Sequence, residues 1–479
     1  MSETTYPSES PLYDRVARVV RGMIDKGSLR PGQRVPSLRS MSRQFKVSIT
    51  TVLEAYSHLE DEGMIRAQPR SGYFVTQRAA VRIPAPRRSR SQRAPRRVKV
   101  GDAVHAIFSL ANRDDVVALG IANPSPELLP TRTLSRLVRN IAGRSSRQAV
   151  DYCFPPGDPL LRREIAIRSS GIEGAVSPDD IVITSGATEA LMTSLTAVAG
   201  AGDVIAVESP AYFMLLQMIE SLGMLALEIA TDPATGMCVD DLHRAVHQID
   251  VKAVISNANF HNPTGSLMPD EEKRRMVRTL AERHIPLIED DIYGDLYFGE
   301  ERPRTLKSFD TSGNVLLCSS FSKTVAPGYR VGWVVPGKYQ DEVMEKKQLV
   351  SSATASLPQM TMAEFLRSGG YDRNLAALRR HYAEQVRQMR GVVAESFPDG
   401  TRVSEPFGGF VLWVELPPGT DSWELFNRAM EQRISITPGL LFSSSGKYRN
   451  FVRLSAGQPW SPRVEEAVRT VGRLAADAQ

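Results

Sequence analysis

The chain of 479 residues, 42% of them hydrophobic, is too long for one hydrophobic core and predicts two or three domains. Its three cysteines lie far apart without a Cys-x-x-Cys pair, which argues against a disulfide framework and indicates a reducing compartment. The polar N-terminus lacks the apolar core of a signal peptide, and no apolar run approaches the roughly 20 residues of a membrane span. We therefore expect a cytoplasmic chain without a membrane partner.

Charge is distributed unevenly along the chain. Residues 1–76 carry 11 basic and 8 acidic side chains, residues 77–100 carry 9 basic and no acidic ones, and residues 101–479 carry 39 basic and 46 acidic ones. We expect a domain, a basic linker rich in proline and arginine, and a larger second domain over these three ranges. The basic end predicts a polyanionic partner, whereas the acidic body suits a small-molecule ligand.

The N-terminal range shows the pattern of a helix-turn-helix. Apolar residues recur at helical spacing over residues 12–23, and Ser37 can cap a second helix over residues 38–45. Ser48 can cap a third helix that ends near residue 62. The first turn of this third helix exposes small hydroxyl groups, which can contact base edges or phosphates.

A β-hairpin follows the predicted helices, with Gly72 near its tip, as in the wing of a winged helix. The segment as a whole resembles the winged-helix domain of GntR-family regulators. The matching features are Gly32, Pro36-Ser-x-Arg39, Thr51-Val-x-x-Ala-Tyr56 and Ser71-Gly-x-Phe-Val75. The resemblance implies that the DNA contacts are made by Arg39, Ser48, Thr50, Thr51 and Gly72. It departs at Ile49, where many members carry Arg or Asn, so an apolar contact to a thymine methyl group would replace a polar base contact there.

Residues 77–100 contain three prolines and many arginines but no apolar periodicity, which predicts a solvated, extended linker. Such a segment can act as a tether, add nonspecific phosphate contacts to the neighbouring DNA-binding domain, or do both.

Beyond this linker, β-rich apolar runs alternate with helical patterns. The runs are residues 181–184, 204–207, 253–256, 286–289 and 315–318. Strands that are buried on both faces and joined by helices predict a mostly parallel α/β sheet. A smaller α+β subdomain is expected from residue 371 onward, with strands at residues 409–415 and 451–455.

Polar groups suited to a phosphorylated pyridine follow these runs in order. After the first run, the amides of Ala187 and Thr188 at a helix start can bind a phosphate. Tyr212 can stack on a planar ring. The amide of Asn262 and the phenol of Tyr293 can bind a ring hydroxyl, and a carboxylate such as Asp290 can keep a ring nitrogen protonated. A later segment offers an amine, two hydroxyls and a guanidinium: Lys323, Ser320, Ser322 and Arg330.

This ordered set resembles the fold-type-I pyridoxal phosphate enzymes, in particular class I and II aminotransferases, over about residues 115–475. The resemblance implies that Lys323 forms an aldimine with pyridoxal 5′-phosphate, that Asp290 pairs with the pyridine nitrogen and that Tyr212 stacks on the ring, with catalytic roles for all three. Further cofactor contacts are implied for Ala187, Thr188, Asn262, Tyr293, Ser320, Ser322 and Arg330. Tyr152 matches a tyrosine that reaches the phosphate of the partner protomer, which implies a homodimer, and Arg453 matches the arginine that binds a substrate carboxylate.

No metal site is expected. His243 and His247 have a helical spacing compatible with zinc, but the intervening residues lack the glutamate of a His-Glu-x-x-His motif and no third ligand is evident. The histidines are therefore interpreted as ordinary helix residues.

A winged helix joined to an aminotransferase-like domain is the arrangement of the MocR/GabR subfamily of GntR-type regulators. The resemblance implies a DNA-binding transcription regulator that binds a double-stranded operator and senses an amine, an amino acid or pyridoxal phosphate itself through the aldimine at Lys323. The alternative is an active aminotransferase with an accessory DNA-binding domain, because the groups needed for transamination are all present. Half-reaction chemistry without turnover is a third possibility. The effector, the operator sequence and the direction of regulation stay open.

Overall fold

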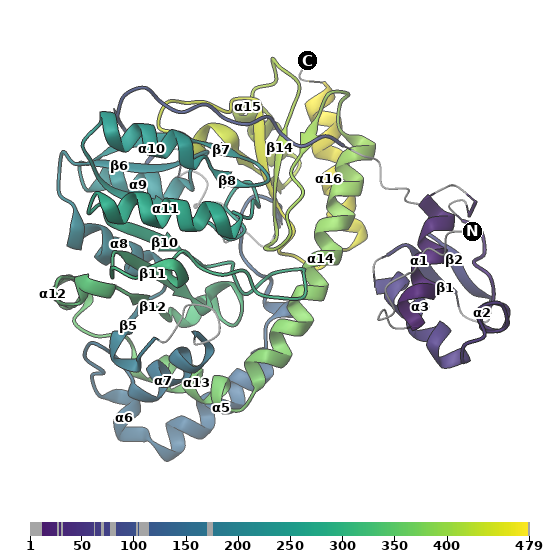
Figure 1. Ribbon diagram of the computed structural model, residues 1–479, viewed down its shortest axis with the longest axis horizontal. Coiled ribbons are helices and arrows are strands. Elements are labelled where there is room, and N and C mark those ends of the chain that lie inside the picture. The colour runs from purple at the N-terminus through teal and green to yellow at the C-terminus, as the bar shows by residue number, and fades with distance from the viewer. Residues whose placement is uncertain are drawn as a thin grey trace, which may run out of the picture. The chain divides into compact units, whose positions relative to one another are not determined.

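The computed structural model of the chain consists of two compact units, Met1–Arg82 and Ile83–Gln479 (Figure 1). The residues that the structure describes are 12–25, 28–29, 32–61, 63–68, 71–76, 83–101, 104, 115–169 and 176–477. Residues 77–82, the first part of the predicted linker, lie outside them.

The N-terminal unit is a three-helix domain with a hairpin wing, as the sequence predicts. Its elements are α1 (Leu12–Asp25), α2 (Leu38–Phe45), α3 (Ile49–Asp61), β1 (Ile65–Gln68) and β2 (Gly72–Val75). The Ser37 hydroxyl accepts from the Ser40 amide at 3.2 Å and thereby caps α2. The hydroxyl of the fully buried Tyr56 donates to the Pro36 carbonyl at 2.6 Å, which ties α3 to the start of α2. The domain thus has its own small core.

The larger unit is built on a nine-stranded sheet. Its strands are β3 (Arg96–Arg97), β5 (Val182–Thr184), β6 (Val204–Ser209), β7 (Leu225–Asp232), β8 (Gly236–Met237), β9 (Val251–Ser256), β10 (Leu287–Asp290), β11 (Val315–Ser320) and β12 (Gly332–Val335). The main order is β3-β7-β6-β9-β10-β11-β12-β5, and β8 pairs with β7. Neighbouring strands from β7 through β11 pair in parallel, and β12 runs antiparallel to both of its neighbours. The sheet confirms the predicted α/β class, although β7 and β12 were not among the predicted runs.

Helices cover both faces of this sheet, which is why its central strands, such as β6 and β11, are buried on both sides (Figure 1). Those of the larger unit are α5 (Thr131–Arg144), α6 (Ser146–Val150), α7 (Pro159–Ser169), α8 (Ala187–Val198), α9 (Phe213–Ser221), α10 (Val239–Gln248), α11 (Asp270–Glu282), α12 (Gln340–Ser351), α13 (Ser356–Arg367), α14 (Gly370–Ser396), α15 (Ser422–Glu431) and α16 (Pro462–Ala476). Among the helices described, none is both long and apolar enough to cross a membrane.

The predicted C-terminal α+β subdomain is present. Its four-stranded sheet has the order β13-β14-β17-β16, with strands β13 (Arg402–Val403), β14 (Val411–Glu415), β17 (Phe451–Ser455) and β16 (Thr437–Pro438). A separate two-stranded sheet pairs β15 (Ile434–Ser435) in parallel with β4 (Val117–Ala118). The long helix α14 and the C-terminal helix α16 pack together beside this sheet (Figure 1).

Residues 83–101, named the strap below, differ from the solvated linker that the sequence predicts. They belong to the larger unit, and within them β3 pairs with β7, the outermost strand of the parallel part of the sheet. The side chain of Ser91 donates to Asp241 at 2.8 Å, and the backbone amide of Arg87 donates to Glu415 at 2.8 Å. The physical reason is that the edge of a sheet offers unpaired backbone groups, and the acidic body attracts a basic segment.

Candidate functional site

One pocket of the larger unit gathers most of the predicted site residues. It lies at the carboxyl ends of the parallel strands, where loops from several strands meet. Ten predicted residues line it: Ala187, Thr188, Tyr212, Asn262, Asp290, Tyr293, Ser322, Lys323, Arg330 and Arg453. They are scattered along the sequence from Ala187 to Arg453, so the fold alone brings them together.

Lys323 ends a short 3-10 helix, Phe321–Lys323, that directly follows β11. Its Nζ donates to the Ala122 carbonyl at 2.7 Å and to Oδ1 of Asn123 at 3.1 Å. Burial, with the nearby charge of Arg453 adding to it, lowers the pKa of the Lys323 amine to about 8. A lysine with such a pKa is partly neutral near physiological pH and can attack an aldehyde.

Asp290 is the last residue of β10 and lies on the pocket wall. Its side-chain atom Oδ1 is buried and has no hydrogen-bond partner within the described part of the chain. Burial raises the pKa of Asp290 to about 7, and the neighbouring carboxylate of Asp291 acts in the same direction. Asn257, at the end of β9, holds the strand end by donating to the Asp290 carbonyl at 2.8 Å. Oδ1 of this carboxylate is therefore available to a cationic group of a bound molecule.

The opposite end of the pocket is suited to an anion. Helix α8 begins at Ala187 after Gly186, whose φ of 87° places it in the region that favours glycine. The Arg330 guanidinium donates to the Ser185 carbonyl at 2.9 Å and approaches the Ser322 hydroxyl at 3.5 Å. A Cβ on Gly186 would collide with that guanidinium. Backbone amides, a hydroxyl and a fixed cation thus converge at a helix N-terminus.

Arg453 lies on β17 with only 2% of its surface exposed. Its Nη1 donates to Oδ1 of Asn262 at 3.0 Å and its Nη2 to the Thr437 hydroxyl at 3.2 Å and to the Gly120 carbonyl. Its Nε is buried without a partner in the described residues. The rings of Phe213 and Phe442 lie 5.6 and 5.3 Å from the guanidinium carbon. This is a desolvated cation with donor capacity to spare for an anion.

Two tyrosines line the remaining wall. Tyr212 lies immediately before α9, and burial raises the pKa of its phenol to about 12. Tyr293 is only 2% exposed, and burial also raises the pKa of its phenol above the ordinary value. Both phenols are therefore neutral donors at physiological pH.

Two predicted cofactor residues do not line this pocket. Ser320 is buried at the end of β11, where its hydroxyl accepts from the Ser322 amide at 3.3 Å and caps the turn that carries Lys323. Tyr152 is 73% exposed and stacks on Phe154 with ring centroids 5.3 Å apart.

Three residues that bind Lys323 or hold the end of the Asp290 strand were not predicted from the sequence, namely Ala122, Asn123 and Asn257. Asn123 lies 200 positions from Lys323, so no local spacing could have linked them. The one available signal was an asparagine placed before a proline, directly after an apolar run.

The residues fit pyridoxal phosphate. The unpartnered Asp290 oxygen suits a protonated ring nitrogen, the Lys323 amine suits an aldehyde, and the α8 terminus with Arg330 suits a phosphate. The glycine at position 186 keeps the phosphate end open to that guanidinium.

The predicted DNA-contact residues lie on the N-terminal unit. Arg39 and Thr50 are exposed, whereas the hydroxyls of Ser48 and Thr51 are 2.8 Å apart, and Ser48 also accepts from the Thr51 amide at 3.0 Å. Ser48 is thus a helix cap as well as a surface group. Gly72 has a φ of 98°, and a Cβ there would lie 3.2 Å from the Arg34 guanidinium.

The surface of α3 also carries exposed apolar side chains. Ile49 is 49% exposed and Leu53 is 44% exposed. Because they are four residues apart, they lie on the same side of the helix, next to the face that buries Val52, Tyr56 and Leu59. The face that would meet DNA is therefore partly apolar.

Both units match families of known proteins. Residues 114–471 match the family model described as aminotransferase class I and II, and residues 12–75 match that of bacterial regulatory proteins of the gntR family. The chain is 38% identical over 461 residues to the HTH-type transcriptional regulator YjiR of Escherichia coli K12, covering 96% of this chain and 98% of that protein. It is 36% identical to YdcR of the same organism, with the same coverage.

Among solved structures, the larger unit resembles the α-aminoadipate aminotransferase LysN of Thermus thermophilus, which was crystallised with N-(5′-phosphopyridoxyl)-L-leucine. The TM-score is 0.73 at 27% sequence identity, over 78% of this chain and 94% of that one.

Proposed function

Because the chain belongs to the class I and II aminotransferase family and joins that fold to a GntR-type winged helix in the MocR/GabR arrangement, we propose that it is a DNA-binding transcription regulator that senses a small amine through bound pyridoxal phosphate. Its HTH-type relatives match across both units. The observation that carries the sensing part of the proposal is the convergence of ten predicted residues on one pocket in a chain that also carries a DNA reader.

Pyridoxal phosphate is the cofactor of this fold. When bound through its aldehyde to the Lys323 amine, it can exchange that amine for the amine of a small molecule. In our proposal Asp290 keeps the ring nitrogen protonated, Tyr212 stacks on the ring, and Asn262 and Tyr293 donate to the ring oxygen. The phosphate is bound by the amides of Ala187 and Thr188, the hydroxyl of Ser322 and the Arg330 guanidinium, with Ser320 supporting them through the turn that it caps.

The effector in this proposal is an amine that also carries a carboxylate, that is, an amino acid. Arg453 supports this because its guanidinium is buried between two aromatic rings and retains an unpartnered Nε. A carboxylate would form two parallel hydrogen bonds with it and replace the protein oxygens that it now contacts. Exclusion of water around the pair strengthens that attraction.

A homodimer completes the proposed site. Five large apolar side chains from two segments of the chain are exposed by 57% or more, namely Val150, Tyr152, Phe154, Leu349 and Val350. Covering them with a second copy would bury apolar surface and bring Tyr152 to the partner's phosphate. A dimer also presents two winged helices, which suits an operator with two half-sites in the cytoplasm.

Two measurements test the regulator proposal. Duplex DNA selected from a random pool should bind the full chain, and its affinity should change when pyridoxal phosphate and an L-amino acid panel are added. Lys323→Ala should abolish the amino acid response while DNA binding persists, and Lys252→Ala, at an exposed position of β9, should behave as the unchanged chain does. A response that survives in Lys323→Ala would refute sensing through the cofactor.

The alternative, an active aminotransferase, is favoured by the intact set of Lys323, Asp290 and Arg453 in the pocket. Steady production of keto acid over many turnovers from the same panel would support it and would refute a pure sensor. Formation of one equivalent of keto acid per site would instead indicate half-reaction chemistry.

A further inference from the structure

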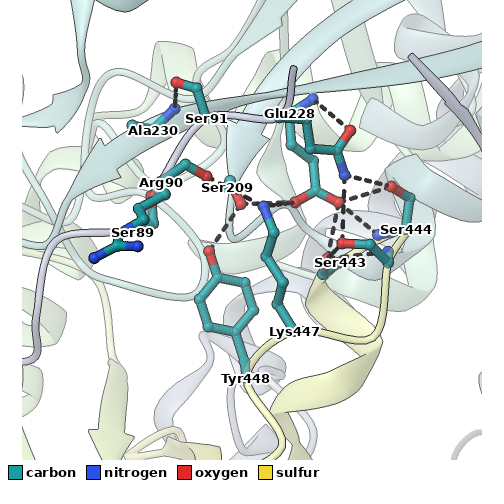
Figure 2. Close-up of polar contacts among 12 residues, drawn as sticks. Ser89, Arg90, Ser91, Ser209, Glu228, Ala230, Ser443, Ser444, Lys447 and Tyr448 are labelled. Atoms are coloured by element: carbon teal, nitrogen blue, oxygen red, sulfur yellow. Dashed lines mark hydrogen bonds and ion pairs between the residues drawn. The ribbon is translucent and has the colours of Figure 1, made fainter. Parts of the chain in front are cut away.

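The strap is bound along β7 by both backbone and side chains (Figure 2). Ser89 and Thr231 exchange hydrogen bonds, with the Ser89 amide donating to the Thr231 carbonyl at 3.2 Å and the Thr231 amide to the Ser89 hydroxyl at 2.7 Å. The Ala230 amide donates to the Ser91 hydroxyl at 2.8 Å. The Gln92 amide donates to the Glu228 carbonyl at 2.8 Å. The strap is therefore held against β7 from Ser89 to Arg97.

Glu228 lies beneath the strap with none of its surface exposed. One carboxylate oxygen accepts from the Ser443 hydroxyl at 2.8 Å and from the amide and hydroxyl of Ser444 at 2.6 and 2.8 Å. The other accepts from the Ser209 hydroxyl at 2.7 Å and from the Lys447 ammonium at 3.1 Å. Disturbing a buried carboxylate that has five donors, one of them a cation, is energetically costly, because losing a partner leaves charge uncompensated.

The donors around Glu228 connect it to the strap. Lys447 Nζ also donates to the Arg90 carbonyl at 3.1 Å, so one ammonium joins the carboxylate to the strap backbone (Figure 2). The Gln92 side-chain amide donates to the Ser444 hydroxyl at 3.1 Å. A shift of the 443–447 loop therefore acts on the strap through two side chains.

The same donors lead into the pocket. Ser443 directly follows Phe442, whose ring packs 5.3 Å from the Arg453 guanidinium. Ser209 lies three positions before Tyr212, and the Ala211 amide between them donates to the Phe442 carbonyl at 2.9 Å. Tyr448, next to Lys447, shares a hydrogen bond of 2.8 Å with Ser209. A ligand that moves Arg453 or Tyr212 thus moves groups that hold Glu228.

We propose that Glu228 and Lys447 form a positioning centre that couples the occupancy of the pocket to the hold of the larger unit on the strap, and hence to the chain that carries the DNA-binding unit. The inference rests on the proposed regulator function and names the route by which the pocket acts. An empty pocket leaves the 443–447 loop free to shift, which loosens the strap from β7. Filling the pocket fixes Phe442 and Ser209, and the strap is then held.

Trypsin cleavage reports on the strap, because its arginines are trypsin sites and binding of the strap to β7 should slow their cleavage. Limited trypsin digestion of the full chain, read by mass spectrometry, is compared with and without pyridoxal phosphate. Pyridoxal phosphate should slow cleavage at Arg87–Lys99 by at least about fivefold, the lower end of ordinary allosteric couplings. No protection of the strap, in protein whose cofactor absorbance shows loading, would overturn the proposal.

Lys447→Met removes the ammonium and keeps the length of a side chain that is 32% exposed. In this variant cleavage of the strap should be equally fast with and without pyridoxal phosphate, while the absorbance band and affinity of the cofactor match the unchanged chain. Gln92→Ala, a change on the strap alone, should reduce the protection without any effect on cofactor binding. Lys346→Met, which removes an ion pair with Glu345 on α12, is the matched control and should leave the protection intact.

DNA affinity separates failure of this inference from failure of the proposed function. If the unchanged chain binds DNA and responds to ligand, but Lys447→Met and Gln92→Ala retain the full protection and the full response, then the regulator stands and the Glu228 route is wrong. If neither the unchanged chain nor the two variants bind DNA, the proposed function fails and this inference fails with it. A loss of the response in both variants, with unchanged affinity in the absence of ligand, supports the route.

Discussion

Asp290→Asn should stabilise the cofactor-free chain at alkaline pH, and the effect should disappear in acid. The folded chain holds the proton of Asp290 with a pKa of about 7, whereas the unfolded chain releases it near 3.8. A raised carboxyl pKa means that the folded state binds more protons, so stability falls as pH rises between these values. Integrating the linkage from pH 5 to pH 8 predicts a loss of about 2 to 3 kcal/mol from this carboxyl in the unchanged chain. The neutral amide cannot titrate and escapes that loss.

Urea denaturation of the larger unit, followed by tryptophan fluorescence in cofactor-free protein, measures this difference. The stability of Asp290→Asn relative to the unchanged chain should grow by about 2 to 3 kcal/mol between pH 5 and pH 8. Asp295→Asn is the opposite control, because Arg302 and the Tyr371 hydroxyl hold the pKa of Asp295 below its ordinary value despite burial. If the difference in unfolding free energy between Asp290→Asn and the unchanged chain is the same at both pH values, the raised pKa assigned to the buried Asp290 carboxyl is refuted.

Further outcomes follow from the two sites. Arg453→Leu should keep pyridoxal phosphate bound but weaken amino acid effectors about tenfold or more, read by titrating the cofactor absorbance with amino acids and with matched amines lacking the carboxylate. Since the Arg453 charge helps to lower the pKa of Lys323, cofactor uptake should rise with pH around 8 in the unchanged chain and at higher pH in this variant. An unaltered pH midpoint would contradict that coupling. If Ile49 and Leu53 contact thymine methyl groups, replacing thymine by uracil in the selected duplex should cost about 1 kcal/mol per methyl group lost, and Ile49→Ala should remove this dependence. Equal affinity for both duplexes would exclude an apolar base contact.

The strap shows where local reading of the sequence was insufficient. Its composition of arginine and proline without apolar periodicity is that of a solvated linker. Its partners are the edge of β7, a strand that was not among the predicted runs, and acidic groups such as Asp241 and Glu415, which lie 150 and 328 positions away. Pairs this far apart cannot be recognised from a short stretch of sequence. A basic segment has the same local composition whether it is solvated or bound to acidic residues of a folded domain.

What the sequence determined by itself was the class of each unit and the chemistry of the pocket. The sequence contains local signals such as the helix cap Ser37, the helical spacing of the buried residues of α3, and the apolar runs of the strands. The residues predicted to surround Lys323 follow these strands in a recognisable order. These features depend on spacing within one turn or one strand, which a sequence records directly.

Only the tertiary structure decided which groups meet. It brought Asn123 into hydrogen-bonding contact with the Lys323 amine, 200 positions away in sequence. It left Oδ1 of Asp290 without a partner among the described residues. It also used the Ser320 hydroxyl to cap the turn that carries Lys323, outside the pocket lining. It also buried Glu228 where the strap and the 443–447 loop converge. Contacts of this kind depend on how β7, β11 and β17 are arranged in the larger unit, and that arrangement is a property of packing rather than of local spacing.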